Sequence, residues 1–226
     1  MTGASVTYWE HIVSQRNRIP SEDPEPMKQR LMRAAETVFH DKGYQGARVS
    51  DIVGLAGAAQ GSFYLHFKSK KAILVELIDG FFAHLMDETL GTHPVADLRN
   101  REDMADQLHI IWTTLIAFCR ARPELTRLVL DAPSSLPPED RQHLARHFDG
   151  IARALAEYCR HTIDKGLVKP LHPDLMGWVI LGMVERALHY AVFVAPGQDL
   201  ADLANDLTEF ELAGLLATGP TGRGTR

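Results

Sequence analysis

The sequence predicts an all-α fold with a small N-terminal helical domain and a larger C-terminal one. Apolar residues recur with helical spacing along most of the chain, prolines and glycines separate the periodic segments, and no segment alternates with a period of two. With 226 residues, of which 45% are apolar, the chain can bury one small and one larger core.

The first predicted helix ends at Gly43. Its apolar residues fall at positions i, i+3, i+4, i+7 and i+8, which places them on one helical face. Glycine commonly follows a helix because it adopts a positive φ without strain. The apolar stripe consists of Leu31, Ala34, Ala35, Val38 and Phe39.

Two short helices are predicted next, joined by a tight turn at Gly57. The third helix covers about residues 59 to 65, and Phe63 and Phe67, four residues apart, anchor it on the core so that its polar side chains face outward. The inward face of the second helix is formed by Ile52, Leu55 and Ala56. The three helices together predict a helix-turn-helix domain.

Helical periodicity continues from residue 72, with prolines at the boundaries. Pro123 and Pro173 suit the first turn of a helix, and Gly166 suits the end of one. A proline-rich loop is expected at 133–138. Six further helices are predicted at 72–90, 103–121, 123–130, 139–165, 173–194 and 200–217.

Charge distinguishes the N-terminal segment from the rest of the chain. Residues 28–74 carry eight basic and three acidic side chains, a net charge of +5, whereas the whole chain carries -5. The remainder therefore sums to -10. A basic module on an acidic protein is typical of binding to a phosphate backbone.

A dense set of motif letters covers residues 28–74. They read A-A-x-x-V-F-x-x-K-G-Y at 34–44, D-I at 51–52, A-G at 56–57 and G-S-F-Y-x-H-F-K-S-K at 61–70. With these letters the segment resembles the N-terminal domain of the TetR family of bacterial transcriptional regulators. The resemblance implies a homodimeric repressor that a small lipophilic or aromatic effector releases from a palindromic operator. An activator, an effector-independent regulator and an interaction module without DNA binding stay open as alternatives.

The resemblance assigns phosphate contacts to three residues. Tyr64 and His66 match the pair that touches backbone phosphates, with packing at the helix edge as the alternative. Lys70 follows Ser69, which is expected to cap the next helix, and matches a phosphate-binding lysine. Its alternative is an ordinary solvated lysine.

Gln60 and Ser62, on the groove-facing side of the third helix, are the candidates for contacts with base edges. Glutamine can pair bidentately with adenine and serine with either base type, although contacts to phosphate or water alone are the alternative. Arg48, at a helix start, could reach a phosphate or a guanine. Ala59 stands where a capping Ser or Thr is common. Loss of such a cap lowers helix stability by about 1 kcal/mol. Because Arg48, Ala58, Ala59 and Gln60 all depart from the family's usual letters, the operator sequence cannot be transferred by analogy.

The last two predicted helices are expected to form the dimer interface, as they do in the family. Gly177 and Gly182 would permit close helix approach, and burial within one subunit is the alternative. The remaining candidates for this interface are Leu181, Leu188, Leu203, Leu207 and Phe210.

The effector is expected among the helices of the C-terminal domain, where the resemblance places it. Aromatic and methionine side chains there could line an apolar pocket or simply form core. Glu185 and His189, four residues apart, are candidate polar handles, unless they pair with each other. The other candidate residues are Phe82, Met86, Trp112, Leu115, Phe118, Tyr158, Trp178 and Met183.

The sequence gives little support for an enzyme, a cofactor-binding protein or a metal-binding protein. No phosphate-cradling glycine loop, nucleophile elbow or paired-carboxylate motif is present, so neither catalysis nor a cofactor is expected. His143 and His147 share metal-compatible spacing, but no third ligand accompanies them in sequence, and no metal site is expected. Cys119 and Cys159 are expected to be buried, inert thiols.

The sequence also predicts four segments of the chain and a cellular location. Residues 1–27 form a flexible extension, 28–74 the DNA-binding domain, 75–217 the effector-binding and dimerisation domain, and 218–226 a flexible tail. No run of 18 apolar residues and no signal-peptide pattern occurs in the letters. A cytoplasmic protein without a membrane partner is therefore expected.

Overall fold

The computed structural model describes residues 25–92, 97–130 and 137–215, which form helices and no strand. The predicted all-α fold class is confirmed. Most of the predicted extension at 1–27, the tail at 218–226 and most of the 133–138 loop lie outside the described residues. The chain divides into two compact units: the first runs to His84 and includes Glu124–Leu144, and the second comprises Leu85–Pro123 and the residues from Ala145 onward. The first unit thus extends past the predicted boundary at residue 74.

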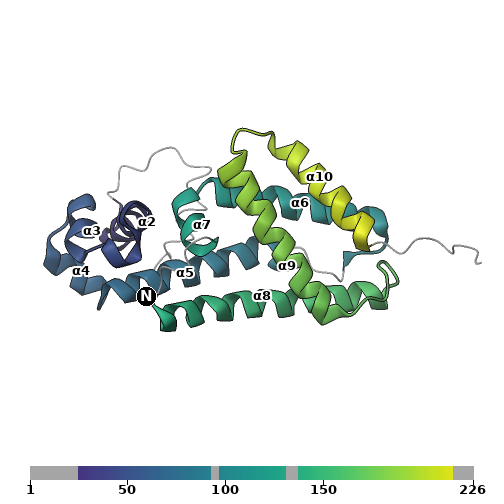
Figure 1. Cartoon of the computed structure of the whole chain (residues 1–226), viewed down its shortest axis with the longest axis horizontal. Coiled ribbons are helices and arrows are strands. Elements are labelled where there is room, and N and C mark those ends of the chain that lie inside the picture. The colour runs from purple at the N-terminus through teal and green to yellow at the C-terminus, as the bar shows by residue number, and fades with distance from the viewer. Residues whose placement is uncertain (1–24, 93–96, 131–136, 216–226) are drawn as a thin grey trace, which may run out of the picture. The chain divides into compact units, whose positions relative to one another are not determined.

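Helix α2 (Met27–Gly46) opens the first unit, and it packs with α3 (Val49–Leu55) and α4 (Gln60–His66) (Figure 1). Its five predicted stripe residues are all buried. Gly43 has a φ of 65°, which interrupts the helical geometry where the sequence predicted the end of the helix. The positive φ expected of Gly57 is also present, at 61°.

The inward face of α3 differs from the prediction. Ile52 and Ala56 are buried as expected, but Leu55 is 57% exposed and Val53 is buried in its place. Successive helical residues turn by about 100°, so Leu55 lies about 110° from the centre of the face that Ile52, Val53 and Ala56 share. The spacing of three residues from Ile52 was therefore a misleading guide in so short a helix.

Three more helical segments belong wholly or partly to the first unit: α5 (Lys70–Met86), α7 (Pro123–Leu130) and the start of α8 (Pro138–Asp164). As predicted, Ser69 caps α5, because its Oγ accepts a hydrogen bond from the Ala72 amide at 3.1 Å. The first turn of α8 is tied to α5 through Lys71, whose ammonium lies 2.7 Å from Glu139 and 3.2 Å from Asp140.

The second unit contains a short π-helical end of α5, called η2 (Asp87–Gly91), then α6 (Arg101–Arg120), the rest of α8, α9 (Pro173–His189), η5 (Tyr190–Val194) and α10 (Leu200–Leu215). Helices α6 and α10 lie side by side (Figure 1). Gly166 follows α8 with a φ of 70°, as predicted. Arg120 stabilises the end of η5, since its guanidinium donates to the carbonyls of Ala191, Ala195 and Gln198 at 3.0 to 3.1 Å.

Candidate functional site

The outward surface of α4 carries the side chains that the sequence predicted to meet DNA. Phe63 and Phe67 are 0% and 3% exposed, so they fix the inner face of this seven-residue helix. Its outer residues are held in place by that anchor. Gln60, Tyr64 and His66 are exposed and Ser62 is half-buried. One short helix therefore presents two hydroxyls, an amide and an imidazole to solvent.

The turn between α3 and α4 is held by Arg30 of α2. Its guanidinium donates hydrogen bonds to the carbonyl of Ala56 and, at 3.3 Å, to that of Gly57. A Cβ on Gly57 would lie 3.0 Å from the same guanidinium nitrogen. Glycine at this position thus satisfies both the positive φ and the close approach of Arg30, which sets the angle at which α4 is presented.

Lys70 has a structural role that the sequence did not reveal. Its Nζ donates to the carbonyl oxygens of Tyr44 at 2.6 Å and Ala47 at 2.8 Å, and it lies 4.4 Å from the centre of the Tyr44 ring. Partial burial lowers the pKa of this ammonium from its ordinary value. Contact with a phosphate stays a prediction, but the ammonium already caps carbonyls at the end of α2.

The positive charge of the segment is largely committed to internal partners. Lys28 pairs with Glu76 at 2.5 Å and Lys42 with Asp51 at 2.8 Å. The hydrogen bond from Lys42, followed by that from the Arg48 amide, lowers the pKa of Asp51. Arg30, Arg33, Lys70 and Lys71 also have protein partners. Arg48 and Lys68 are exposed, which makes them the basic side chains best placed to reach a phosphate.

Two exposed residues near α4 were missed by the sequence reasoning. Leu65 is 84% exposed although it lies between Tyr64 and His66. Lys68 follows directly after the buried Phe67. The spacing of Phe63 and Phe67 already placed Leu65 off the core face, so the same helical periodicity could have found it. An exposed leucine on such a helix suits contact with a thymine methyl group.

The predicted dimer residues divide into two groups in the structure. Leu181, Leu188 and Leu203 are buried within the single chain. A Cβ on Gly177 would lie 2.3 Å from the carbonyl oxygen of Ala152, so its close approach is to α8 of the same chain. Gly182 has open space, Leu207 is half-buried and Phe210 is 69% exposed. The dimer interface stays a prediction.

Other apolar side chains of α9 are exposed instead. Leu175, Trp178 and Val179 are 57%, 52% and 53% exposed, at positions i, i+3 and i+4 of one stripe. Trp178, predicted to line an effector pocket, therefore lies largely outside the core. The segment Pro173–Val194 is also long and apolar enough to cross a membrane by length and composition.

A buried polar cluster lies inside the second unit, among α6, α8 and α10. Trp112 donates its indole N–H to Glu211 Oε2 at 3.0 Å, and Tyr158 donates its hydroxyl to Gln107 Oε1 at 3.0 Å. Burial raises the pKa of Glu211 to about 7, against a smaller lowering by the Trp112 hydrogen bond. Burial, followed by the charge of Glu211, raises the pKa of Tyr158.

Glu211 and Gln107 were absent from the predicted effector residues, and no local letter pattern would have flagged them. Glu211 lies on α10, which the family resemblance reserved for dimerisation. Burial, followed by the charge of Glu211, also raises the pKa of the Cys159 thiol, to about 11. Cys119 and Cys159 are both buried, as predicted, and neither forms a disulfide with another described residue.

The remaining effector candidates are distributed through both units. Phe82 is buried in the first unit, and Leu115 and Phe118 are buried in the second. Burial raises the pKa of the half-buried Glu185. The His189 ring packs edge-on against Phe193, 5.4 Å away. Met86 and Met183 are half-buried, and a shared pocket for these residues stays a prediction.

Comparison with known proteins identifies both parts of the chain. Residues 31–77 match the family described as bacterial regulatory proteins, tetR family, and residues 101–189 match the tetracyclin repressor-like C-terminal domain. An uncharacterized HTH-type transcriptional regulator, YdgC of Bacillus subtilis, is 29% identical over 85% of this chain and 94% of its own.

One further relative and one solved structure of similar fold cover most of the chain. The fatty acid metabolism regulator protein of Bacillus subtilis is 27% identical over 84% of this chain and 96% of its own. The crystal structure of the transcriptional regulator FadR from Bacillus subtilis, in complex with stearoyl-CoA, aligns with a TM-score of 0.69 at 22% identity, over 82% of this chain and 97% of that one.

Proposed function

The chain belongs to the TetR family of bacterial transcriptional regulators, and from this premise we propose that it is a cytoplasmic repressor that a lipophilic effector releases from its operator. It is a DNA-binding transcriptional regulator. The observation that carries the DNA-binding role is the outer surface of α4, where exposed Gln60, Tyr64 and His66 stand opposite the buried Phe63 and Phe67. Phosphate contacts fix the register of such a helix, and base contacts give it specificity.

The proposed contacts follow from this arrangement. Gln60 and Ser62 read base edges, with Leu65 against a thymine methyl, and Tyr64 and His66 contact phosphates. Arg48 and Lys68 add phosphate contacts, because most other basic side chains of the domain have partners within the protein. Lys70 contributes mainly by holding the end of α2, with a phosphate contact secondary.

Selection of random duplex DNA by the purified protein, at about 150 mM salt, would supply the operator. Enrichment of an inverted repeat is expected, with half-site centres about 34 to 36 Å apart. On that operator, Gln60→Ala should relax the preference at one base pair per half-site, whereas Lys68→Ala should weaken binding to all sequences and reduce the salt slope by about 1. The control is Arg153→Ala, which removes an exposed basic side chain of α8, outside the helix-turn-helix. Unchanged specificity in Gln60→Ala would contradict the base-reading role.

A second copy of this chain is proposed to cover the exposed stripe of α9. Trp178 and Phe210 are aromatic residues of the kind that dominates interface energies, and a palindromic site requires a two-fold partner. Trp178→Glu should convert dimers to monomers in analytical ultracentrifugation, while Ile110→Glu, also at an exposed apolar residue but on α6, should not. Dimers that survive Trp178→Glu would place the interface elsewhere.

The effector is proposed to be a long acyl chain carried on coenzyme A. Two observations support this class: the aromatic and aliphatic interior of the second unit, and the similarity to regulators whose names concern fatty acid metabolism and a stearoyl-CoA complex. Stearoyl-CoA should release a fluorescent operator from the protein, and free coenzyme A should not. Release by neither compound, with operator binding intact, would reject this class of effector. An activator would instead bind its operator and raise transcription from a linked reporter.

A further inference from the structure

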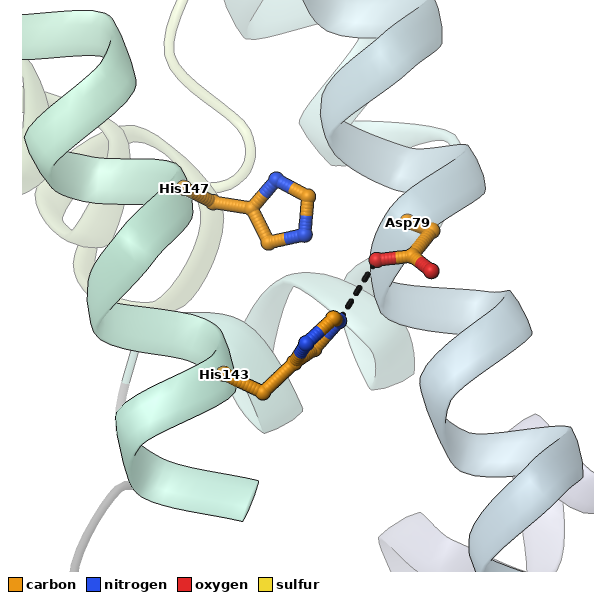
Figure 2. A group of neighbouring side chains, drawn as sticks. All are labelled: Asp79, His143 and His147. Atoms are coloured by element: carbon orange, nitrogen blue, oxygen red, sulfur yellow. Dashed lines mark hydrogen bonds and ion pairs between the residues drawn. The ribbon is translucent and has the colours of Figure 1, made fainter. Parts of the chain in front are cut away.

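Three potential metal ligands from two helices lie together at α5 and the first turns of α8. Asp79 comes from α5, and His143 and His147 come from successive turns of α8, which is one continuous helix from Pro138 to Asp164. His143 Nε2 lies 2.6 Å from Asp79 Oδ1, and one ligand atom of each residue lies within 4.8 Å of the other two. Figure 2 shows both imidazole rings on the side of α8 that faces Asp79.

We propose that Asp79, His143 and His147 form a binding site for a divalent transition-metal ion such as zinc. Two imidazole nitrogens and one carboxylate oxygen are a ligand set that suits Zn²⁺, which takes a fourth ligand from water at an open site. This site is separate from the proposed DNA and effector contacts and does not depend on them.

The geometry requires only a small adjustment to hold an ion. Zinc bonds to nitrogen and oxygen are about 2.0 to 2.2 Å long, so tetrahedral ligand atoms stand about 3.3 Å apart. Asp79 Oδ1 and His143 Nε2, now at hydrogen-bond distance, must move apart by less than about 1 Å. Ligand atoms of the three residues that are now up to 4.8 Å apart must move closer together. Rotation of three half-buried side chains can supply such shifts without moving a helix.

The third ligand explains why the sequence alone did not predict this site. The spacing of His143 and His147 places both rings on one helical face, but two ligands do not make a zinc site. Asp79 lies 64 residues before His143, and only the packing of α5 against the start of α8 brings it close. An ion pair explains the short distance between Asp79 and His143, but it gives the His147 imidazole no role. A metal site would use both imidazoles.

A bound ion would cross-link α5 to α8. Helix α5 follows α4 after only three residues, and the nearby Lys71 already ties α5 to Glu139 and Asp140 in the first turn of α8. Metal binding would add a stronger link one to two turns further along α8. The ion would therefore restrain the start of α8 relative to the DNA-binding helices.

The test is a cobalt titration of the full chain, prepared without a polyhistidine tag and treated with a chelator. Co²⁺ occupies zinc sites and absorbs visible light, more strongly at low coordination number. We expect saturation at one Co²⁺ per chain, loss of the band on adding Zn²⁺, and binding at least 10-fold weaker in each of Asp79→Asn, His143→Gln and His147→Gln. His161→Gln is the control, because His161 is an exposed histidine on the same helix.

Two results would overturn the proposal. One is the absence of a saturable cobalt band in the folded parent protein, which requires no variant to fold. The other is an unchanged affinity in His143→Gln and Asp79→Asn, which would place the ion at other histidines. Circular dichroism of each variant shows whether weaker binding reflects a lost ligand or a lost fold, and His147→Ala serves as a second variant if His143→Gln unfolds.

Discussion

Replacement of Gly177 by alanine tests the packing of α9 on α8. A Cβ at this position would lie 2.3 Å from the carbonyl oxygen of Ala152 and 3.0 Å from the amide nitrogen of Ala156. Both are backbone atoms of α8, so a side-chain rotation cannot relieve the overlap. Helix α9 must move by about 1 Å to reach ordinary contact distance, because real Cβ atoms essentially never approach within 3.0 Å of another heavy atom.

The expected cost can be set against the intrinsic preference of alanine for helices. Overpacking a tight contact costs about 1 to 3 kcal/mol, and a clash with backbone belongs at the upper end. Alanine is better than glycine in a helix interior by about 1 kcal/mol. The net loss in the free energy of unfolding is therefore about 2 kcal/mol, which lowers the melting temperature by about 4 to 8 °C in a chain of this size.

Gly150→Ala in the middle of α8 is the matched control, because Gly182 lies on the face of α9 that a second copy is proposed to cover. No atom lies within 4 Å of a Cβ added at Gly150, so only the helix preference should act. We expect a melting temperature higher by about 2 to 4 °C. Both variants should be unfolded thermally at one fixed protein concentration, since dimerisation would make the midpoint concentration-dependent. If Gly177→Ala stabilised the protein as much as Gly150→Ala, the close approach of α9 to α8 would be refuted.

Two further predictions concern charged groups whose roles the structure revealed. Lys70→Met should lower the free energy of unfolding by about 1 to 3 kcal/mol, because it leaves two carbonyls without their donor, whereas Lys68→Met should leave urea unfolding unchanged. Equal stability of the two variants would contradict the capping role. The carboxyl group of Glu211 has a pKa raised from 4.5 to about 7 by burial, so the folded state keeps a proton that the unfolded state releases. The free energy of unfolding should therefore fall by about 3 kcal/mol as pH rises through that interval. Glu211→Gln keeps an acceptor for Trp112 and should flatten this dependence, while the exposed Glu209→Gln should not.

Helix positions could be predicted from the sequence because local chemistry decides them. Gly43, Gly57 and Gly166 stand where the backbone takes a positive φ, and Pro123 and Pro173 begin the helices that they were expected to begin. These signals act over one or two turns, so they survive without knowledge of the tertiary fold. The apolar stripe of α2 was equally clear because it extends over more than two turns.

Side-chain partners could not be predicted in the same way. Arg30 and Lys70 were counted as positive charge available to DNA, but each reaches main-chain carbonyls 23 to 27 residues away. Glu211 finds its partner Trp112 across 99 residues. Burial of a charged or polar group is decided by such long-range packing, and the sequence of α10 alone gives Glu211 no feature that separates it from the exposed Glu209.

The apolar character of α9 could reflect packing against a second protein surface or insertion into a membrane. The two faces of the helix help to separate these explanations. One face is already committed to protein, since Gly177 contacts the α8 backbone and Leu181 and Leu188 are buried. A helix that crossed a lipid bilayer as a single span would instead present apolar side chains to lipid on every side. The exposed stripe with Trp178 therefore fits one more protein surface, and Trp178→Glu decides between the two. Monomers formed without detergent would support a second copy as the partner, whereas sedimentation of the parent protein with phospholipid vesicles would support a membrane role.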